Sequence, residues 1–315
     1  MKMRYSNLDE VGVTGSFRDL LQWQRERRRK RKDLSYHHPQ AKIKEVSWLK
    51  GNRDVPAITF IGHSTVLIQL GGVNMITDPV WASWLGMYRR LTEPGLRLDE
   101  LPEIDIVLLS HSHYDHLHYQ SIKRLPGKPK YFVPAGLKRA FERRGLSDVQ
   151  EFKWWDRVEF KSLSLTFVPA QHWTKRTLFD TNRSHWGGWV IEPDNGPTVY
   201  YAGDSGYFRG FKEIGERFSI DYCLMPIGAY EPEWFMKEQH VNPEEAIQAF
   251  LDTKAGHMIP IHFGAFMLAD DTPKEALDRM HAEWDRLKMD PNHLHVLQLG
   301  ESRKLTLGFG CVRSG

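Results

Sequence analysis

The sequence predicts an α+β fold in which two β-sheets are covered by outer helices, a layered sandwich rather than a barrel or a doubly wound sheet. From Ala57 onward, short apolar runs are broken by glycine and proline, which is typical of strands joined by turns. Many of the expected strands follow one another as meanders, and helical segments follow only some of them. A chain of 315 residues is long enough to bury a core of this kind.

The first 54 residues differ in composition from the rest. We expect residues 1–54 to form a basic helical extension, with a helix from about Ser16 to Arg31, and residues 55–315 to form one catalytic domain. The run from Arg25 to Lys32 carries seven basic side chains and one acidic side chain. Two interpretations of this run stay open: a solvated helix face, or a contact with anionic lipid headgroups or nucleic acid.

The domain begins with consecutive strands. Gly71 and Gly72 predict a hairpin turn between the runs 66–70 and 73–76. Further strands are expected at Ile104–Leu109, Tyr131–Val133, Val158–Phe160, Ser164–Val168, Gly188–Ile191, Thr198–Ala202, Tyr222–Met225 and Met258–Ile261. Helices are expected at Leu137–Arg144, Pro243–Asp252 and Pro273–Leu287; Asn242 is a suitable N-cap for the second of these.

The composition restricts the class of protein. Apolar residues make up 41% and charged residues 26%, as in ordinary folded proteins, and the formal charge of +3 is too small to argue for nucleic acid alone. The two cysteines, Cys223 and Cys311, show no spacing typical of a disulfide framework or a zinc cluster, so a reducing compartment is expected. The sequence contains no apolar stretch approaching the ~20 residues that span a bilayer. We expect a cytoplasmic protein with at most peripheral contact with the inner face of a membrane.

The stretch SHSHYDHLH, from Ser110 to His118, follows an expected strand. One tight loop there offers His111, His113, Asp115 and His116, a mixture of nitrogen and oxygen ligands that suits zinc and similar divalent ions. Four such residues within six positions are hard to assign to chance, so the loop predicts a metal site. His118 lies two positions beyond the motif and is left out.

Three more ligand residues follow other expected strands: His172, Asp204 and His262. Together with the loop they make five histidines and two aspartates, more than one four-coordinate ion uses. Two metals ~3.5 to 4 Å apart, with a carboxylate and a hydroxide between them, would use all seven residues. The expected cofactor is therefore a pair of divalent ions, zinc first, with manganese or iron as alternatives.

The motif HSHYDH, with these three downstream residues, resembles the metallo-β-lactamase superfamily. That resemblance implies a four-layer αβ/βα sandwich with a dinuclear site between the sheets. It does not specify the substrate, because members of the superfamily act on many substrates. Members place an aspartate after an early strand to orient a ligand histidine, and Asp78 has this position; a turn aspartate before proline is the alternative.

Longer strings resemble the branch of N-acyl-phosphatidylethanolamine-hydrolysing phospholipase D, from about Ile58 to Arg303: PAQHWTKRTLFD, YYAGDSGYF, MPIGAYEPEWFMKEQHVNPEEA, IHFGAF and LGESR. By that resemblance, His111, His113 and His172 bind one ion, Asp115, His116 and His262 bind the other, and Asp204 bridges them. The resemblance also places His240 at the mouth of the active site, in contact with the substrate phosphate. Asp115 is then expected to hold the proton of the nucleophile, and His240 to assist as an electrophile or an acid.

Other residues near the motif have two interpretations. His63 lies outside the ligand count and is expected in a structural or supporting role rather than a catalytic one. Tyr114 either faces the substrate or packs as an ordinary aromatic residue. An apolar patch follows Asp78, and it forms either part of the core or a lip that accepts acyl chains: Trp81, Trp84, Leu85, Met87 and Tyr88.

The leading hypothesis is a phosphodiesterase that hydrolyses an amphipathic phospholipid such as N-acyl-phosphatidylethanolamine. A lactonase or a nucleotide or RNA phosphodiesterase on the same dinuclear site is the alternative. A di-iron redox protein is disfavoured, because its branch replaces the second motif histidine with glutamate and needs a flavin domain. A binding module with a vestigial site is disfavoured because all seven candidate ligands are present. Contact with an anionic membrane and a homodimer stay open, and no specific nucleic acid partner is expected.

Overall fold

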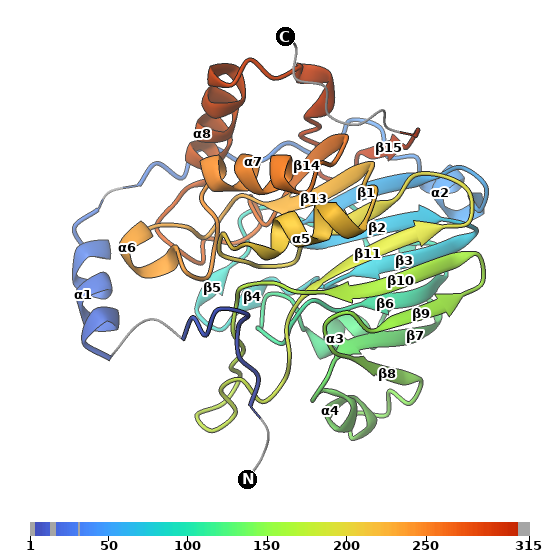
Figure 1. Ribbon diagram of the computed structural model, residues 1–315, viewed down its shortest axis with the longest axis horizontal. Helices are drawn as coiled ribbons and strands as arrows, with labels where there is room; N and C mark the ends of the chain where they lie inside the picture. The colour runs from blue at the N-terminus through green and yellow to red at the C-terminus, as the bar shows by residue number, and fades with distance from the viewer. Residues whose placement is uncertain (1–3, 13–16, 31, 308–315) are drawn as a thin grey trace.

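The computed structural model describes residues 4–12, 17–30 and 32–307. Three residues named in the sequence predictions, Ser16, Arg31 and Cys311, lie outside these ranges. Figure 1 shows two large β-sheets packed against each other, with helices on the outside.

The first sheet is formed mainly by the N-terminal half of the chain. Its strands β1, β2 and β3 pair antiparallel, whereas β3, β6, β7 and β8 run parallel. It has seven strands, in the order β15 (Ser302–Lys304), β1 (Ala57–Gly62), β2 (Thr65–Leu70), β3 (Val73–Thr77), β6 (Ile104–Leu108), β7 (Gly127–Pro134) and β8 (Val149–Phe152).

The second sheet is formed by the C-terminal half. Strands β9 to β12 pair antiparallel, and β12, β13 and β14 run parallel. Its six strands lie in the order β14 (His257–Ile261), β13 (Tyr222–Pro226), β12 (Val199–Tyr201), β11 (Gly188–Pro193), β10 (Leu163–Val168) and β9 (Arg157–Phe160). A separate small hairpin joins β4 (Trp84–Leu85) to β5 (Tyr88–Arg89).

The helices lie at the periphery. Helix α7 has the predicted bounds, and the Asn242 side chain accepts a hydrogen bond from the Glu245 N–H as its N-cap. The α-helices are α1 (Phe17–Arg27), α2 (Val46–Gly51), α3 (Tyr119–Ile122), α4 (Lys138–Glu142), α5 (Gly210–Arg217), α6 (Glu233–Met236), α7 (Pro243–Asp252) and α8 (Pro273–Arg286). The short 3₁₀ helices are η1 (Leu98–Glu100) and η2 (Pro291–His293).

The predicted glycine hairpin is present between β2 and β3. Leu70 pairs with Val73, and the two glycines between them have φ values of +56° and +72°. A turn with two positive φ values matches the right-handed twist of the flanking strands, and glycine adopts it without steric cost. Every residue of β2 and β3 is buried, so the turn fixes the register of two core strands.

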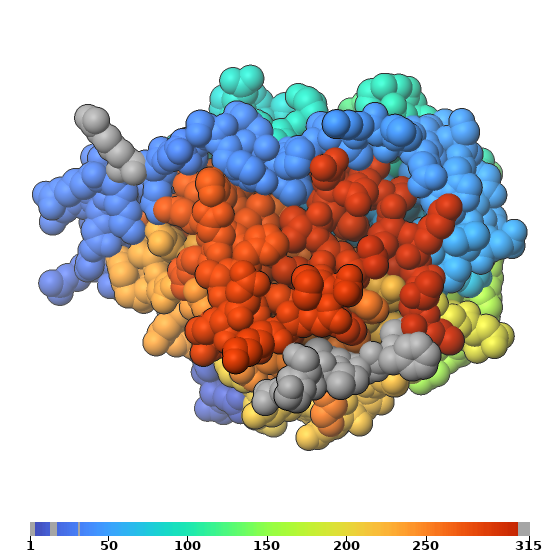
Figure 2. Space-filling view, turned by 90° about the horizontal axis from the view of Figure 1, so that it is seen from above, coloured from blue at the N-terminus to red at the C-terminus, as the bar shows by residue number. Residues whose placement is uncertain are grey.

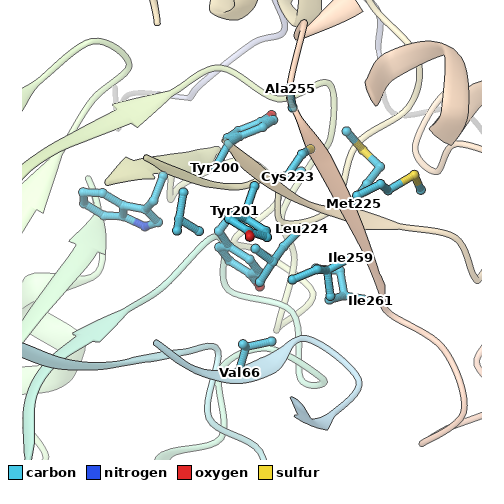
Figure 3. Packing of buried hydrophobic residues seen from close by; sticks show 14 of the residues in the cluster. Val66, Tyr200, Tyr201, Cys223, Leu224, Met225, Ala255, Ile259 and Ile261 are labelled. Atoms are coloured by element: carbon cyan, nitrogen blue, oxygen red, sulfur yellow. The ribbon is translucent and has the colours of Figure 1, made fainter. Parts of the chain in front are cut away.

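The two sheets share one hydrophobic core. Figure 3 shows Val66 of β2 on the side of the second sheet, below Leu224 of β13 and Ile261 of β14. A second cluster covers the other face of the first sheet, where Leu49 of α2, Ile122 of α3 and Phe141 of α4 pack on its strands. Helices α5, α7 and α8 cover the second sheet (Figure 1). The order helix, sheet, sheet, helix confirms the predicted four-layer α+β sandwich.

The N-terminal residues lie against the domain. In Figure 2 the blue segment runs along the orange and red C-terminal elements. Helix α1 ends at Arg27, short of the predicted Arg31, and part of the basic run pairs with acidic side chains of the domain. Arg27 Nε lies 3.3 Å from Asp270 Oδ1, and Lys32 Nζ lies 3.0 Å from both Glu231 Oε2 and Glu275 Oε1. The basic run is therefore not a uniformly free cationic face.

None of the helices in the described ranges combines the length and the apolar character that crossing a bilayer requires.

Candidate metal centre

The ends of six strands meet at one edge of the sandwich. His63 follows β1, Asp78 follows β3, the loop 111–116 follows β6, His172 follows β10, Asp204 follows β12 and His262 follows β14. At three of these ends the chain turns sharply, with φ of +58° at His63, +32° at Asp78 and +60° at His262. Left-handed φ values are rare for residues other than glycine, and they concentrate where a fold fixes side chains for function.

The first predicted ligand group comes together. The Nε2 atom of His111 lies 2.9 Å from Nδ1 of His113, which lies 3.1 Å from Nε2 of His172. Burial lowers the pKa of His113 to about 4 and the pKa values of His111 and His172 well below the ordinary value. The three imidazoles are therefore neutral, as metal ligands must be.

The second predicted group surrounds Asp115. Its Oδ2 atom lies 3.3 Å from His116 Nε2 and 3.5 Å from His262 Nε2. His63 Nε2 lies 3.0 Å from the same oxygen, so the structure adds a neighbour that was left outside the ligand count. Burial lowers the pKa of His63 to about 3, so its ring is neutral. The ring can either donate a hydrogen bond from Nε2 to Asp115 Oδ2 or bind a metal ion through the same nitrogen.

Asp204 lies between the two groups. Its Oδ2 atom is 3.1 Å from His116 Nε2 and 3.2 Å from His262 Nε2. It is also 3.9 Å from the Nε2 atoms of both His111 and His172. The Asp204 carboxylate thus lies near both groups, which is where a residue predicted to bridge two ions would have to lie.

The charges at the centre are those of a cation site. Burial alone would raise the pKa values of Asp115 and Asp204, but the facing histidines, His116 foremost and His262 with it, together outweigh burial and hold both carboxyls well below the ordinary pKa. The two carboxylates in turn raise the pKa of His262 to about 9, against the effect of burial. The facing carboxylates also raise the pKa of His116 well above its ordinary value, so the two aspartates favour cations at His116 and His262, whether protons or metal ions.

The donor set fits metal ions. Among the described residues, His116 Nε2, His262 Nε2 and Asp204 Oδ1 are buried without a hydrogen-bond partner. Buried polar atoms without partners are costly, and ions bound at this edge would satisfy them. Imidazole and carboxylate ligands suit zinc, manganese and iron.

Oxygen atoms outside the two groups orient the ligand rings. Asp78 Oδ2 lies 2.7 Å from His116 Nδ1, and Asp78 also accepts hydrogen bonds from the backbone N–H and the hydroxyl of Ser110. The Ser110 hydroxyl lies 2.9 Å from His111 Nδ1. A carboxylate at Nδ1 leaves the Nε2 lone pair free toward the centre. The structure thus places Asp78 where the orienting role requires it.

The structure brings His240 to the same centre. Its Nδ1 atom is 3.8 Å from Asp204 Oδ2, and its side chain lines the adjoining cavity. Burial lowers the pKa of His240 to about 4, so the ring is neutral near pH 7. The ring of His240 is therefore a neutral imidazole rather than an imidazolium, and its Nδ1 atom is buried without a hydrogen-bond partner among the described residues.

A cavity of about 590 Å³ opens over the centre. A second hollow of about 390 Å³ adjoins it, and both are lined by His113, Asp115, Tyr88 and Leu268. The remaining walls of the first cavity include Trp173, Leu178 and Met236, and those of the second include Leu85, Met87 and Tyr114.

The predicted apolar patch divides between the core and this mouth. Trp81 donates its indole N–H to the Leu96 carbonyl and packs on the core, and Leu85 is buried. Trp84 and Met87 are 58% and 82% exposed. Tyr114 is also exposed, and its hydroxyl donates to the Arg176 carbonyl. The outward part of the patch therefore has the position of a lip.

Sequence reasoning missed two residues that support the metal centre, one at the metal loop and one at His172. Arg176 donates from Nη1 to the carbonyls of Ser112 and Leu117, at 2.7 and 2.9 Å. The carbonyl of Gln239 lies 2.9 Å from His172 Nδ1. Arg176 and Gln239 fall within the strings PAQHWTKRTLFD and MPIGAYEPEWFMKEQHVNPEEA, which was the only signal that pointed to them.

Comparisons with known proteins agree with this geometry. Residues 73–263 match the model of the beta-lactamase superfamily domain. The chain is 39% identical over 228 residues to the N-acyl-phosphatidylethanolamine-hydrolyzing phospholipase D 1 of Caenorhabditis elegans, which covers 66% of this chain and 64% of that relative. It is 34% identical over 246 residues to the mitochondrial N-acyl-phosphatidylethanolamine-hydrolyzing phospholipase D of Saccharomyces cerevisiae, which covers 73% and 52%. The chain thus spans less than two thirds of the length of either relative.

A solved structure supports the fold. A metallo hydrolase from the hyperthermophilic archaeon Ignicoccus hospitalis superposes with a TM-score of 0.60 at 20% identity, over 79% of this chain and 98% of that one. By the family model and the two relatives, the chain belongs to the metallo-β-lactamase superfamily, in the branch that includes the N-acyl-phosphatidylethanolamine phospholipase D-like proteins.

Proposed function

We propose that the protein is a phosphodiesterase that cleaves an amphipathic phospholipid of the N-acyl-phosphatidylethanolamine type, releasing an N-acylethanolamine and phosphatidic acid. The observation that carries the proposal is the pair of ligand groups joined by Asp204 at the base of an apolar-walled cavity. The two relatives named above support the substrate class, because both are named for this hydrolysis.

Two divalent ions, zinc first among them, fit the two groups. Bound there, they would supply an activated water and neutralise charge on the phosphoryl oxygens. His111, His113 and His172 would hold one ion, and Asp115, His116 and His262 the other, with Asp204 between them. The surrounding bonds keep these side chains in place before substrate arrives, which lowers the cost of reorganisation.

Asp115 is the residue proposed to hold the proton of the attacking water. Its Oδ2 atom faces three imidazoles, and its carboxyl lies at the floor of both hollows. The low pKa of this carboxyl keeps it ionised and able to accept a hydrogen bond. Asp115 would pass this proton to the alcohol oxygen that leaves when its bond to phosphorus breaks.

His240 is proposed to bind the phosphate. It lies at the side of the cavity, and a neutral ring offers one N–H donor to a phosphoryl or leaving oxygen. This role differs from the acid catalysis considered from the sequence, because a ring with a pKa of about 4 carries no extra proton at neutral pH.

The surface around the mouth is proposed to contact a membrane that presents the substrate. Leu178 and Phe179 are 81% and 76% exposed beside the first cavity, and Met87 is exposed beside the second. Large exposed apolar side chains at one rim are typical of surfaces that enter the lipid interface. The exposed members of the basic run, Arg25, Arg28 and Arg29, would favour anionic lipid.

The test combines metal analysis with a substrate panel. The purified protein should bind two ions per chain and should hydrolyse N-acyl-phosphatidylethanolamine faster than unacylated phosphatidylethanolamine. Bis-p-nitrophenyl phosphate should be cleaved slowly, because it lacks the chains that fill the cavity. Full activity with fewer than two ions would overturn the dinuclear mechanism. Inert lipids together with a rapidly opened lactone would assign the site to the lactonase class, and rapid cleavage of RNA would assign it to the nucleotide phosphodiesterases.

A further inference from the structure

The N-terminal segment from Tyr5 to Gly12 runs beside the loop that carries His172. The Tyr5 N–H donates to the Asn182 carbonyl at 2.9 Å, and the Tyr5 ring stacks on His185 with centroids 4.3 Å apart. Further along, Asp9 Oδ1 pairs with Arg209 Nε at 2.8 Å. In Figure 1 this dark-blue segment lies next to the yellow-green loop that follows β10. The segment is therefore fixed to the domain on both sides of Asn7.

Asn7 contacts the backbone of a metal-ligand residue. Its Oδ1 atom accepts one hydrogen bond from the His172 N–H and another from the Trp186 indole N–H, each at 3.0 Å. Its Nδ2 atom donates to the Val11 carbonyl at 2.8 Å. Asn7 is 7% exposed, and His172 and Trp186 are fully buried.

These three bonds fix the orientation of the Asn7 amide. A flipped amide would point its NH₂ at two N–H donors and its oxygen at a carbonyl, so only one orientation is satisfied. The Asn7 oxygen is also the one acceptor recorded for the His172 N–H among the described residues. Without that oxygen, a buried N–H next to the metal ligand would have no partner.

His172 is thus held at two points. Asn7 holds its backbone N–H, and the Gln239 carbonyl lies 2.9 Å from its Nδ1 atom. With both points fixed, Nε2 of the ring is aimed at His113 Nδ1, 3.1 Å away. Loss of a partner that fixes a ligand histidine from outside the ligand sphere typically lowers metal affinity by about 10- to 100-fold.

We propose that Asn7 is a positioning residue for the ion held by His111, His113 and His172, so that the N-terminal segment is part of the metal centre. This inference rests on the proposed dinuclear site. The proposed role of the segment concerns only the ion position that includes His172. The described contacts of Asn7 reach His172 and none of the second group, Asp115, His116 and His262.

The test measures zinc affinity at each position separately by chelator competition. The His262→Ala background weakens the second group and leaves the first, whereas His113→Ala does the reverse. Asn7→Ala and Asn7→Leu should each lower the affinity about 10- to 100-fold in the His262→Ala background. The same substitutions should leave the affinity in the His113→Ala background unchanged. Asn7→Leu keeps the volume of the side chain but offers no acceptor. A loss of affinity shared by both variants therefore comes from the missing acceptor and not from the cavity that alanine leaves.

Two further variants complete the design. Asn7→Asp keeps an oxygen acceptor for both N–H groups and should restore most of the affinity. Asp9→Asn removes the charge of the exposed pair with Arg209 but keeps an oxygen acceptor for Arg209 Nε, so it should leave the segment in place and change neither position. Equal losses of zinc affinity in the two backgrounds, or no loss in either, would overturn the proposed role of Asn7 but not the dinuclear site. Parent proteins that bind no zinc in either background would overturn the dinuclear site and this inference together.

Discussion

At the scale of single residues, residue type and strand-end position indicated which side chains could bind metal. The seven candidate ligands lie close together because each follows the end of a strand at the same edge, whereas their division into two groups joined by Asp204 was implied by the family resemblance. The contact of His63 with Asp115 was not predicted, since a histidine in a tight turn after the first strand has no periodic signal. The partners of His172 were not predictable either, because one of them is a backbone carbonyl that any residue offers.

His240 provides a prediction at this scale. His240→Ala should lower kcat about 100-fold, the typical effect of removing one donor that stabilises developing charge. His240→Gln keeps an N–H donor and should retain more activity than the alanine variant. Because burial lowers the pKa of His240 to about 4, activity should not fall as pH rises through 6.5, as it would if an imidazolium were required. The measurements are kcat and metal content across pH 5 to 8.

The control for this prediction is His281→Ala, which removes an exposed histidine on α8 away from the cavity. It should leave kcat and the pH profile unchanged. Intact turnover in His240→Ala with both ions bound would remove the proposed phosphate contact.

At the scale of elements, long periodic segments were predictable and short ones were not. Helix α7 has the predicted bounds, and α8 ends one residue before the predicted Leu287. The two-residue strands of the β4–β5 hairpin were missed, because two residues cannot show an alternation. Helix α1 ends before the predicted Arg31, and Lys32 beyond it pairs with Glu231 and with Glu275 of α8.

The metal loop after β6 provides a prediction at this scale. Arg176 donates to two loop carbonyls and its guanidinium lies over the Tyr114 ring, with Cζ 4.1 Å from the centroid. Arg176→Ala should leave those carbonyls without a partner, at about 1–3 kcal/mol each, and loosen the loop. Hydrogen exchange measured by mass spectrometry should rise in the peptide containing residues 112–118, and zinc affinity should fall.

Arg144→Ala is the matched control. Its guanidinium lies over Tyr119, 4.0 Å from the centroid, and it donates to the Ala140 carbonyl, but it makes no recorded contact with residues 111–117. Exchange in the same peptide should stay as in the unaltered protein. Equal exchange in both variants would show that Arg176 does not brace the loop.

At the scale of the whole molecule, the sandwich explains why a site is possible at all. Residues from both sheets and from His63 to His262 meet at one edge, so neither half of the chain carries the centre alone. The layered class was predictable from meanders and following helices, whereas the sheet order was not, because strand periodicity does not specify pairing partners. The docking of the N-terminal residues on the domain was also missed, since it depends on single polar contacts such as the hydrogen bond from Trp23 to Asp270.

The rim of the cavity provides the prediction at this scale. The double variant Met87→Ser and Phe179→Ser should lower turnover of substrate in anionic vesicles by at least about 10-fold, because each side chain gains about 1.5–3 kcal/mol when buried in an apolar phase. Turnover of soluble bis-p-nitrophenyl phosphate should not change. Vesicle co-sedimentation should fall in parallel with lipid turnover.

Ile43→Ser is the control for the rim, because Ile43 is 79% exposed and lines neither hollow. It should leave vesicle binding unchanged. A double variant that binds and cleaves vesicle lipid normally would show that the rim does not enter the interface.

The hydrogen bond between Asn7 and His172 joins residues 165 positions apart. At a rate of synthesis of about 5–20 residues per second, His172 is added many seconds after Asn7. His262 follows ninety residues after that. The second group of ligands is therefore complete only late in synthesis, and the occupation of both groups by ions would follow the pairing of segments that lie far apart in the sequence.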